Sequence, residues 1–235
     1  MSATALSNHF QKLRIRAAGT VMITIAAPVF LLSFLFSCAG QGAVQLDGVE
    51  IRDYQGQNLS SVATDFRENS IKGPQYIDRD SYRLEINGMV ERPESLTYDQ
   101  VLNRQHYSKV SELNCVEGWS VNIFWEGVLV RDLLTEAGVK PGANTVILYA
   151  VDGYTTSFPL SFFYDRDIIM AARMNDVTIP PERGFPFHLV AEEKWGYKWI
   201  KWITRIELSD NESYKGYWEK RGYNDNGDLS GPKYD

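Results

Sequence analysis

The sequence predicts a single domain of the α+β class built around a mixed sheet. The chain has 235 residues, of which 44% are hydrophobic and 23% charged, as in a globular protein large enough for one sizeable core. Segments with the two-residue period of strands and the longer period of helices follow one another irregularly. The loops between them are too short for a regular series of parallel crossovers, which favours a mixed α+β arrangement.

The first half of the domain contains four predicted elements: a strand at residues 81–88, a helix at 98–103, an extended segment at 109–115 and a helix at 128–138. Asn87-Gly88 is a turn signal that ends the first strand. Thr97 can act as N-cap of the first helix, and Gly138 ends the second. The extended segment places Cys115 at the end of a strand or just past it.

The second half contains predicted strands at residues 145–151, 154–158, 187–191 and 201–208, a helix at 161–171 and a loop at 179–184. Asp152-Gly153 is the turn between the first two of these strands. The tail after Ser209 alternates polar and aromatic residues, and we expect it to wrap the surface of the domain.

The N-terminal 37 residues have the composition of an export signal. Lys12, Arg14 and Arg16 precede 21 uncharged residues, 17–37, and Leu-Phe-Ser-Cys38 then resembles a bacterial lipobox. We therefore expect a lipoprotein signal peptide whose removal leaves an acylated Cys38 as the mature N-terminus. The alternative is an uncleaved membrane anchor, since about 20 apolar residues span a bilayer. Either arrangement holds the folded part outside the cytoplasm, on a membrane.

The predicted organisation is a lipoprotein signal peptide at 1–37, a polar tether at 38–68, the main domain at 69–217 and a C-terminal tail at 218–235. Removing the three basic residues of the signal peptide leaves 21 basic against 30 acidic residues. A chain this acidic is poorly suited to binding nucleic acid through its phosphates, so no nucleic-acid partner is expected.

Cys115 is the only cysteine after Cys38, so it has no partner for a disulfide. One reading is a small buried hydrophobic side chain. A cysteine hydrolase would need His106 or His188 as general base, and neither lies in a telling motif. Zinc needs more sulfur or nitrogen ligands than the chain offers, and there is no haem c or nucleotide-phosphate motif. There remains a soft sulfur ligand to a transition metal that a bulky cofactor already holds.

Residues 194–205 place four basic residues and several aromatics within twelve positions of an otherwise acidic chain. Basic groups with tryptophan faces would suit a phosphorylated heterocyclic ligand. The alternative reading is an amphipathic strand whose lysines are solvated.

Three segments together resemble the molybdopterin-binding domain of the sulfite oxidase family: Cys115-Val-Glu-Gly-Trp-Ser, then Ile179-Pro-Pro-Glu-Arg-Gly-Phe-Pro-Phe-His-Leu-Val, then Trp195-Gly-Tyr-Lys-Trp-Ile-Lys-Trp-Ile. The similarity extends from about residue 69 to about residue 217. It is strongest to small bacterial members typified by the catalytic subunit of the periplasmic methionine sulfoxide reductase.

The resemblance implies the mixed-sheet fold of that family and a molybdenum centre held by one pterin and one protein thiolate, matched by Cys115. It also implies a set of residues that contact the pterin or its phosphate: Asn69, Ile71, Lys72, Arg183, His188, Trp199, Ile200 and Lys201. A phosphate among Lys201, Arg183 and His188 would gain charge-assisted hydrogen bonds.

Three features depart from the family. His188 stands where the family usually has arginine, which would weaken phosphate binding unless Arg183 or Lys198 compensates. Arg14 and Arg16 are not adjacent, unlike the arginines of the twin-arginine signal common in cofactor-loaded members. The 235 residues leave no room for the further C-terminal dimerisation domain or the haem domain of vertebrate-type members, so we expect neither. We therefore expect a monomer that passes electrons to a separate membrane or periplasmic partner.

The resulting hypothesis is an extracytoplasmic molybdenum oxidoreductase that performs two-electron oxygen-atom transfer on a small molecule. Candidate substrate-facing residues are Glu117, Trp119, Asp152 and Tyr154; otherwise Glu117 is a surface acid and Trp119 a core aromatic. No arginine cluster marks an anion pocket, so a sulfoxide-like or N-oxide-like substrate is favoured over sulfite. The competing hypothesis is a lipid-tethered binding module that keeps the fold without the metal.

Overall fold

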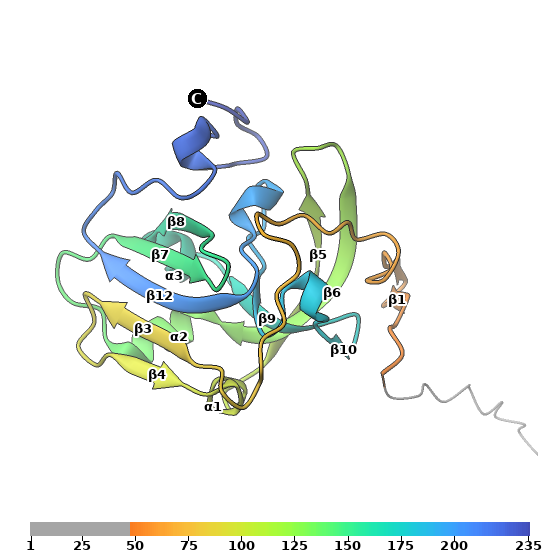
Figure 1. The fold of residues 1–235 in the computed structure, drawn as a ribbon, viewed down its shortest axis with the longest axis horizontal. Coiled ribbons are helices and arrows are strands. Elements are labelled where there is room, and N and C mark those ends of the chain that lie inside the picture. Colours follow the sequence, from red (N-terminus) through yellow and green to blue (C-terminus); the bar gives the residue numbers. More distant parts are fainter. Residues whose placement is uncertain (1–47) are drawn as a thin grey trace, which may run out of the picture. The chain divides into compact units, whose positions relative to one another are not determined.

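A computed structural model describes residues 48–235, which contain two five-stranded sheets and a small two-stranded one (Figure 1). The predicted signal peptide, its membrane-anchor alternative and Cys38 lie outside the described residues. Within residues 48–235 no helix is long and apolar enough to cross a bilayer.

The first sheet has the strand order β4-β3-β12-β7-β8. Its strands are β4 Glu94–Leu96, β3 Leu84–Gly88, β12 Ile203–Ser209, β7 Thr145–Ala150 and β8 Thr155–Pro159. The central pair β12 and β3 is parallel, while the other neighbours are antiparallel. The prediction of a mixed sheet is therefore confirmed.

The second sheet has the order β10-β9-β6-β5, with β11 pairing to β9. Its strands are β10 Val177–Thr178, β9 Ile169–Met174, β6 Ser120–Leu129, β5 Tyr107–Asn114 and β11 His188–Leu189. β5 and β6 form a long antiparallel hairpin that is continuously paired from Tyr107↔Gly127 to Asn114↔Ser120. The hairpin turn carries Cys115, just past the end of β5 as predicted.

Three short helices accompany the sheets: α1 Tyr98–Leu102, α2 Val130–Ala137 and α3 Leu160–Tyr164. Thr97 caps α1 as predicted, because its side chain accepts a hydrogen bond from the Gln100 backbone and Gln100 returns one to Thr97. The apolar face of α2 is fully buried, and Gly138 ends the helix. Among the described residues, the largest fully buried hydrophobic side chains are Trp125, Trp202, Phe163 and Phe187.

The predicted helix at residues 161–171 is wrong beyond Tyr164, because residues 169–174 form strand β9. The four residues from Ile169 to Ala172 are successively buried, as in a strand covered on both faces. Such a run lacks the two-residue alternation that identifies a half-exposed strand. The predicted helix at 128–138 also begins two residues too early, since Val128 and Leu129 complete β6 and α2 starts at Val130.

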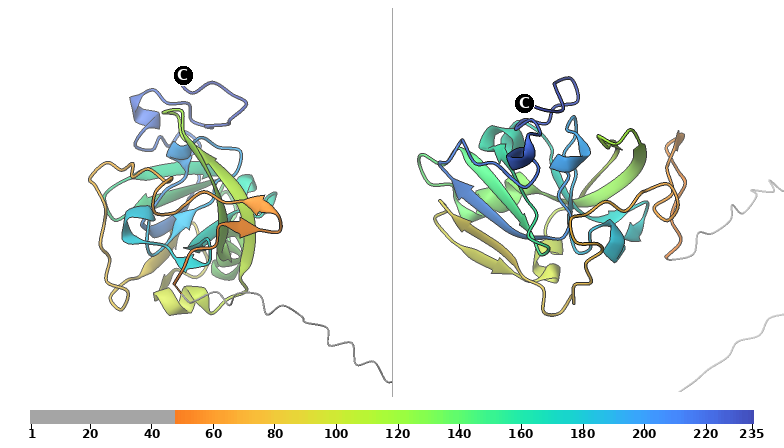
Figure 2. Two further views of the ribbon diagram at one scale, coloured as in Figure 1. Left: turned by 90° about the vertical axis from the view of Figure 1, so that its right-hand side faces the viewer. Right: turned by 45° about the horizontal axis from the view of Figure 1, so that its top comes forward.

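The described part of the predicted tether packs onto the domain. Strands β1 Asp53–Tyr54 and β2 Gln57–Asn58 form a hairpin, drawn in orange in Figure 2. The Tyr54 ring stacks on the ring of Phe124 in β6, with the ring centroids 4.1 Å apart. Val62 and Phe66 join the core. This corrects the tether prediction for residues 50–68, whose polar sequence hides a small set of anchoring side chains.

Three single turns of 3-10 helix complete the described structure: η1 Pro181–Arg183, η2 Gly196–Lys198 and η3 Glu219–Arg221. η2 belongs to the basic segment 194–205, and Lys198 within it is completely buried. The alternative reading of this segment, a strand with solvated lysines, is therefore contradicted.

Candidate functional site

A cavity of about 140 Å³ lies where five separate segments of the chain meet. Eleven of the predicted site residues line it: Asn69, Ile71, Cys115, Glu117, Trp119, Asp152, Tyr154, His188, Trp199, Ile200 and Lys201. Lys72 and Arg183 do not. The cavity also has lining residues that sequence reasoning missed: Phe66, Arg67, Ser70, Leu113, Val116, Gly196, Tyr197, Trp202, Trp218 and Tyr223.

Cys115 is held by a tight turn at the tip of the β5–β6 hairpin. Its backbone N–H donates to the Trp119 carbonyl at 2.9 Å, and the Gly118 N–H donates to the Cys115 carbonyl at 3.1 Å. Gly118 has φ +86°, a conformation that costs a side-chain-bearing residue energy, which explains glycine at the third position after the cysteine. The sulfur is thus carried by a hydrogen-bonded turn on a paired scaffold.

The thiol has two polar neighbours, the Glu117 backbone N–H and the Asn69 side-chain amide, whose Nδ2 lies 3.8 Å from Sγ. Burial raises the pKa of the Cys115 thiol, and these two hydrogen bonds only partly oppose that shift. The free protein therefore holds a neutral thiol. A metal ion that binds it must displace the proton, because the thiolate is the ligand form.

His188 is fully buried behind the cavity wall, with its ring 5.0 Å from that of Trp125. Nδ1 lies 2.8 Å from the Arg183 carbonyl oxygen, so this nitrogen carries the proton and donates it. Desolvation, together with the charge of Lys201, lowers the pKa of His188 to about 3. The imidazole is neutral, and Nε2 offers a lone pair to the cavity.

This state revises the sequence expectation for His188. A neutral Nε2 accepts hydrogen bonds and gives a phosphate no charge-assisted donor. The atom is suited to an N–H group of a heterocycle instead. The departure from the family's arginine at this position therefore changes the kind of contact.

Three buried polar atoms of lining residues have no hydrogen-bond partner among residues 48–235: Ser70 Oγ, Trp119 Nε1 and His188 Nε2. Unpaired buried polar atoms are costly, so a set of them around one cavity indicates a polar ligand. Two of the atoms can donate and one accepts, which matches a pterin carrying both kinds of group. Together with the Cys115 sulfur, the residues present fit a molybdopterin cofactor.

Lys201 is a basic residue of the cavity lining, and its side chain forms an ion pair with Glu68. Its ammonium group lies 3.2 Å from the Glu68 carboxylate and 4.2 Å from the centre of the Trp202 ring. Burial lowers the pKa of Lys201, and Glu68 partly restores it. A phosphate could take the place of Glu68, an acid that is one-third exposed, without leaving a buried charge unpaired.

Arg183 lies behind Phe66, with its guanidinium 5.2 Å from the centre of that ring. Nε donates to the Val62 carbonyl oxygen at 2.9 Å, while Nη1 is buried with no partner in the described chain. Arg183 thus fastens residues 62–66 to the domain. It keeps one nitrogen free for an anion, although the side chain does not line the cavity.

Lys198 does not compensate for His188, because its ammonium group points away from the cavity. It lies 2.7 Å from the Glu219 carboxylate, and both side chains are 1% exposed. It also donates to the backbone carbonyls of Ser157 and Asp225. The cluster of basic residues at 194–205 thus marked a segment that lines the cavity, but its lysines have different roles: Lys201 lines the cavity, whereas Lys198 forms a buried ion pair.

The predicted substrate-facing residues divide into two groups. Asp152 is buried and accepts from the Tyr154 N–H, and the Tyr154 hydroxyl donates to the Tyr197 carbonyl, so both side chains are engaged in structure. Glu117 is exposed in the turn after Cys115, and the Trp119 Nε1 is free as described above. Glu117 is therefore available to a substrate, and Trp119 Nε1 to a substrate or a cofactor.

In the part of the chain that the structure describes, no three His, Cys, Asp or Glu side chains gather closely enough to hold a metal ion. A metal at this cavity would have Cys115 as protein ligand and would need its other ligands from a cofactor. The donor set therefore suits a metal that arrives already bound.

Comparison with known proteins gives a consistent result. The family model for the oxidoreductase molybdopterin-binding domain matches residues 71–218. An uncharacterized oxidoreductase of Bacillus subtilis is 35% identical over 66% of this chain and 78% of its own. A putative protein-methionine-sulfoxide reductase subunit of Azospira oryzae is 32% identical over 63% of this chain and 56% of its own.

The structure is similar to that of the sulfane dehydrogenase SoxCD from Paracoccus pantotrophus, with a TM-score of 0.63 and 25% identity. The match covers 70% of this chain and 46% of that one. This chain thus spans about half the length of the dehydrogenase and of the Azospira relative.

Proposed function

The chain belongs to the oxidoreductase molybdopterin-binding domain family, that of the sulfite oxidases, and from this premise we propose that it transfers an oxygen atom from a sulfoxide-like or N-oxide-like substrate. The observation that carries the proposal is the Cys115 sulfur in the wall of a cavity with unpaired polar atoms. The relatives named as methionine sulfoxide reductase subunits support a sulfoxide as the substrate class.

One thiolate and one cavity support a mononuclear centre bound through one pterin. Cys115 would hold the metal, and Asn69 would orient the sulfur through its amide. Ser70 and Trp119 would donate to the cofactor, and His188 would accept from it. Lys201 would bind the phosphate, with the free Arg183 nitrogen behind it.

The overall reaction converts a sulfoxide, two electrons and two protons into a thioether and water. When bound, the molybdenum cofactor supplies the electron pair and takes up the oxygen atom. Glu117, two residues from the metal ligand and open to solvent, is placed to pass protons to the departing oxygen. The electrons come from a separate electron-transfer partner.

The charges of the cavity favour an uncharged substrate. Arg67 and Lys201 stand against Glu117 and Asp152, so the charged lining residues balance. A cavity without excess positive charge gives sulfite little electrostatic attraction. We therefore place a neutral sulfoxide or N-oxide ahead of sulfite.

We also propose that the enzyme acts outside the cytoplasm as a monomer anchored by a lipid on Cys38. The support is the sequence of residues 1–38: basic residues, an apolar run and a cysteine at its end.

Cys115→Ser tests the proposal directly. Activity should be measured with a reduced dye and a panel of sulfoxides, N-oxides and sulfite, on protein purified from its native host. We expect a loss of at least about a hundredfold, since even residues that only support a metal ligand are worth 10- to 100-fold. Circular dichroism should be unchanged. Turnover equal to that of the wild type would remove Cys115 from the role of metal ligand.

Metal analysis of the wild-type protein separates the enzyme from the competing binding module. Mass spectrometry should find about one molybdenum per chain if one thiolate holds one centre. Folded native protein without molybdenum would instead support a module that has kept the fold and lost the metal.

A further inference from the structure

The C-terminal strap, residues 210–235, contributes two side chains to the cavity, Trp218 and Tyr223. The family model ends at residue 218, so Tyr223 belongs to a part of the chain outside the shared domain. In Figure 1 the strap, dark blue, runs past β8 and the η2 turn. The outer cavity wall is therefore partly built by residues beyond the matched domain.

The first attachment of the strap is the buried Lys198–Glu219 ion pair. The same carboxylate accepts from the Thr156 hydroxyl at 2.7 Å, which fixes the strap to β8. At Gly216 an added Cβ would collide with the Thr155 carbonyl and the Glu219 carboxylate, so the close approach needs glycine. The strap thus has one defined resting position.

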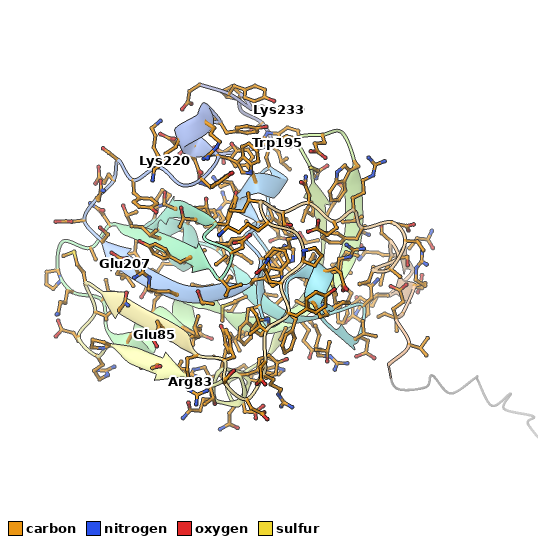
Figure 3. All side chains as sticks on the ribbon, in the orientation of Figure 1. Arg83, Glu85, Trp195, Glu207, Lys220 and Lys233 are labelled. Atoms are coloured by element: carbon orange, nitrogen blue, oxygen red, sulfur yellow. The ribbon has the colours of Figure 1, made fainter. Side chains whose placement is uncertain are left out.

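A second set of attachments lies beside the hairpin turn of Cys115. Lys194 pairs with Asp228, and the Tyr197 hydroxyl donates to the Asn224 carbonyl at 2.7 Å. The Lys233 ammonium sits 4.4 Å from the centre of the Trp195 ring, and the two labelled side chains lie together in Figure 3. Together with the Lys198–Glu219 ion pair, these contacts hold the strap on both sides of Tyr223.

Tyr223 is the centre of an aromatic cluster. Its ring lies 5.0 Å from that of Tyr197, 5.1 Å from Trp218 and 4.8 Å from Tyr234. Tyr197 and Trp218 line the cavity as Tyr223 does, and Cys115 and Glu117 share that lining. A substrate whose sulfur approaches Cys115 would meet this aromatic wall with its neighbouring groups.

We propose that Tyr223 and Trp218 determine substrate specificity by forming a wall that selects the apolar group next to the reacting sulfur or nitrogen. Aromatic rings bind methyl-sulfur and hydrocarbon groups well and exclude branched groups that exceed the remaining space. The identity of the reacting group rests on the proposed function, whereas the existence of the wall does not.

The first test measures access to the Cys115 thiol in the full-length protein produced without cofactor. A bulky aromatic maleimide is the probe, and peptide mass spectrometry reads the labelling rate of Cys115 separately from Cys38. Tyr223→Ala and Trp218→Ala should each raise this rate about tenfold by opening one wall. Tyr214→Ala is the matched control, because Tyr214 belongs to the strap and lines a different cavity.

The second test uses the molybdenum-loaded enzyme and the ratio of kcat/KM for an aryl methyl sulfoxide and dimethyl sulfoxide. Tyr223→Ala should change this ratio about tenfold, mainly through KM, as expected when a pocket wall is removed. Tyr214→Ala should leave it unchanged.

The outcomes of the two tests are separable. Unchanged Cys115 labelling in both cavity-wall variants, with their circular dichroism intact, would overturn the wall. Faster labelling with no change in the kinetic ratio would overturn its role in specificity. If the enzyme reduces no sulfoxide or N-oxide at all, the labelling result still decides whether the wall exists, and only the proposed function fails.

Discussion

Cys115 and His188 line the same cavity but differ in protonation: the thiol keeps its proton, whereas the imidazole does not take up a second one. The sulfur keeps its proton until a metal displaces it, because burial raises the pKa of the thiol. The imidazole is held without its second proton, because the Arg183 carbonyl takes the only N–H. The sequence predicted both residues as part of the site, but the tautomer of His188 depends on ring packing and on a carbonyl that no motif records.

The state of His188 predicts a dependence of stability on pH. Its pKa is about 3 in the folded protein and about 6.5 when unfolded, so between these values only the unfolded chain takes up the proton. Stability should therefore fall as pH decreases from 7. For this group alone the loss between pH 7 and pH 5 is about 2 kcal/mol.

Chemical denaturation of the cofactor-free protein at pH 7 and pH 5 measures this effect. His188→Asn is the control, because an asparagine amide can still donate to the Arg183 carbonyl and does not titrate. The variant should lose about 2 kcal/mol less than the wild type over this range. Equal losses in the two proteins would show that His188 is not kept neutral by the fold.

At the scale of elements, the β5–β6 hairpin and the η2 turn position the site. The hairpin carries the metal-ligand candidate, and an isolated bridge between Asn114 and Trp195 brings the η2 segment alongside it. The sequence predicted an extended segment at 109–115, which is most of β5, with Cys115 at its end or just past it. It missed β6 and β9; in β9 the residues from Ile169 to Ala172 are all buried, so no alternation marks the strand.

The Lys198–Glu219 ion pair between η2 and the strap carries a prediction about stability. Burial lowers the pKa of Lys198, and Glu219 is the main group that opposes this shift. Glu219→Gln leaves a buried ammonium without its counter-charge and should reduce the free energy of unfolding by about 3–5 kcal/mol.

Urea denaturation of the full-length, cofactor-free chain gives the comparison. The double variant Lys198→Met/Glu219→Leu removes both charges and should stay close to the wild type, since well-packed apolar pairs often replace buried ion pairs without loss. A double variant as unstable as Glu219→Gln would mean that packing or the Thr156 hydrogen bond, and not charge pairing, fastens the strap.

For the molecule as a whole, the fold class and most of the cavity were predictable. Cys115 and the residues around 183 and 199 stand in distinctive local sequences, so their meeting could be expected from the family resemblance. The packing of residues 50–68 and the contribution of Trp218 and Tyr223 could not. Both segments are polar and irregular, and their attachment depends on single buried side chains such as Phe66 and Glu219.

The predicted lipid anchor can be tested on intact cells. Cys38→Ala should move the protein from the membrane to the soluble fraction, because acylation needs the cysteine thiol. Fractionation with detection of the full-length protein is the measurement. Continued membrane association would favour the uncleaved apolar anchor over the lipid.

Because the strap is C-terminal, the residues that line the cavity are synthesised in a fixed order. Translation produces Asn69, Cys115, His188 and Lys201 before it reaches Trp218 and Tyr223. The cavity wall formed by Trp218 and Tyr223 is thus the last to be synthesised, and Glu219 can dock against Lys198 only after that. Until then the cavity lacks these two of its lining residues.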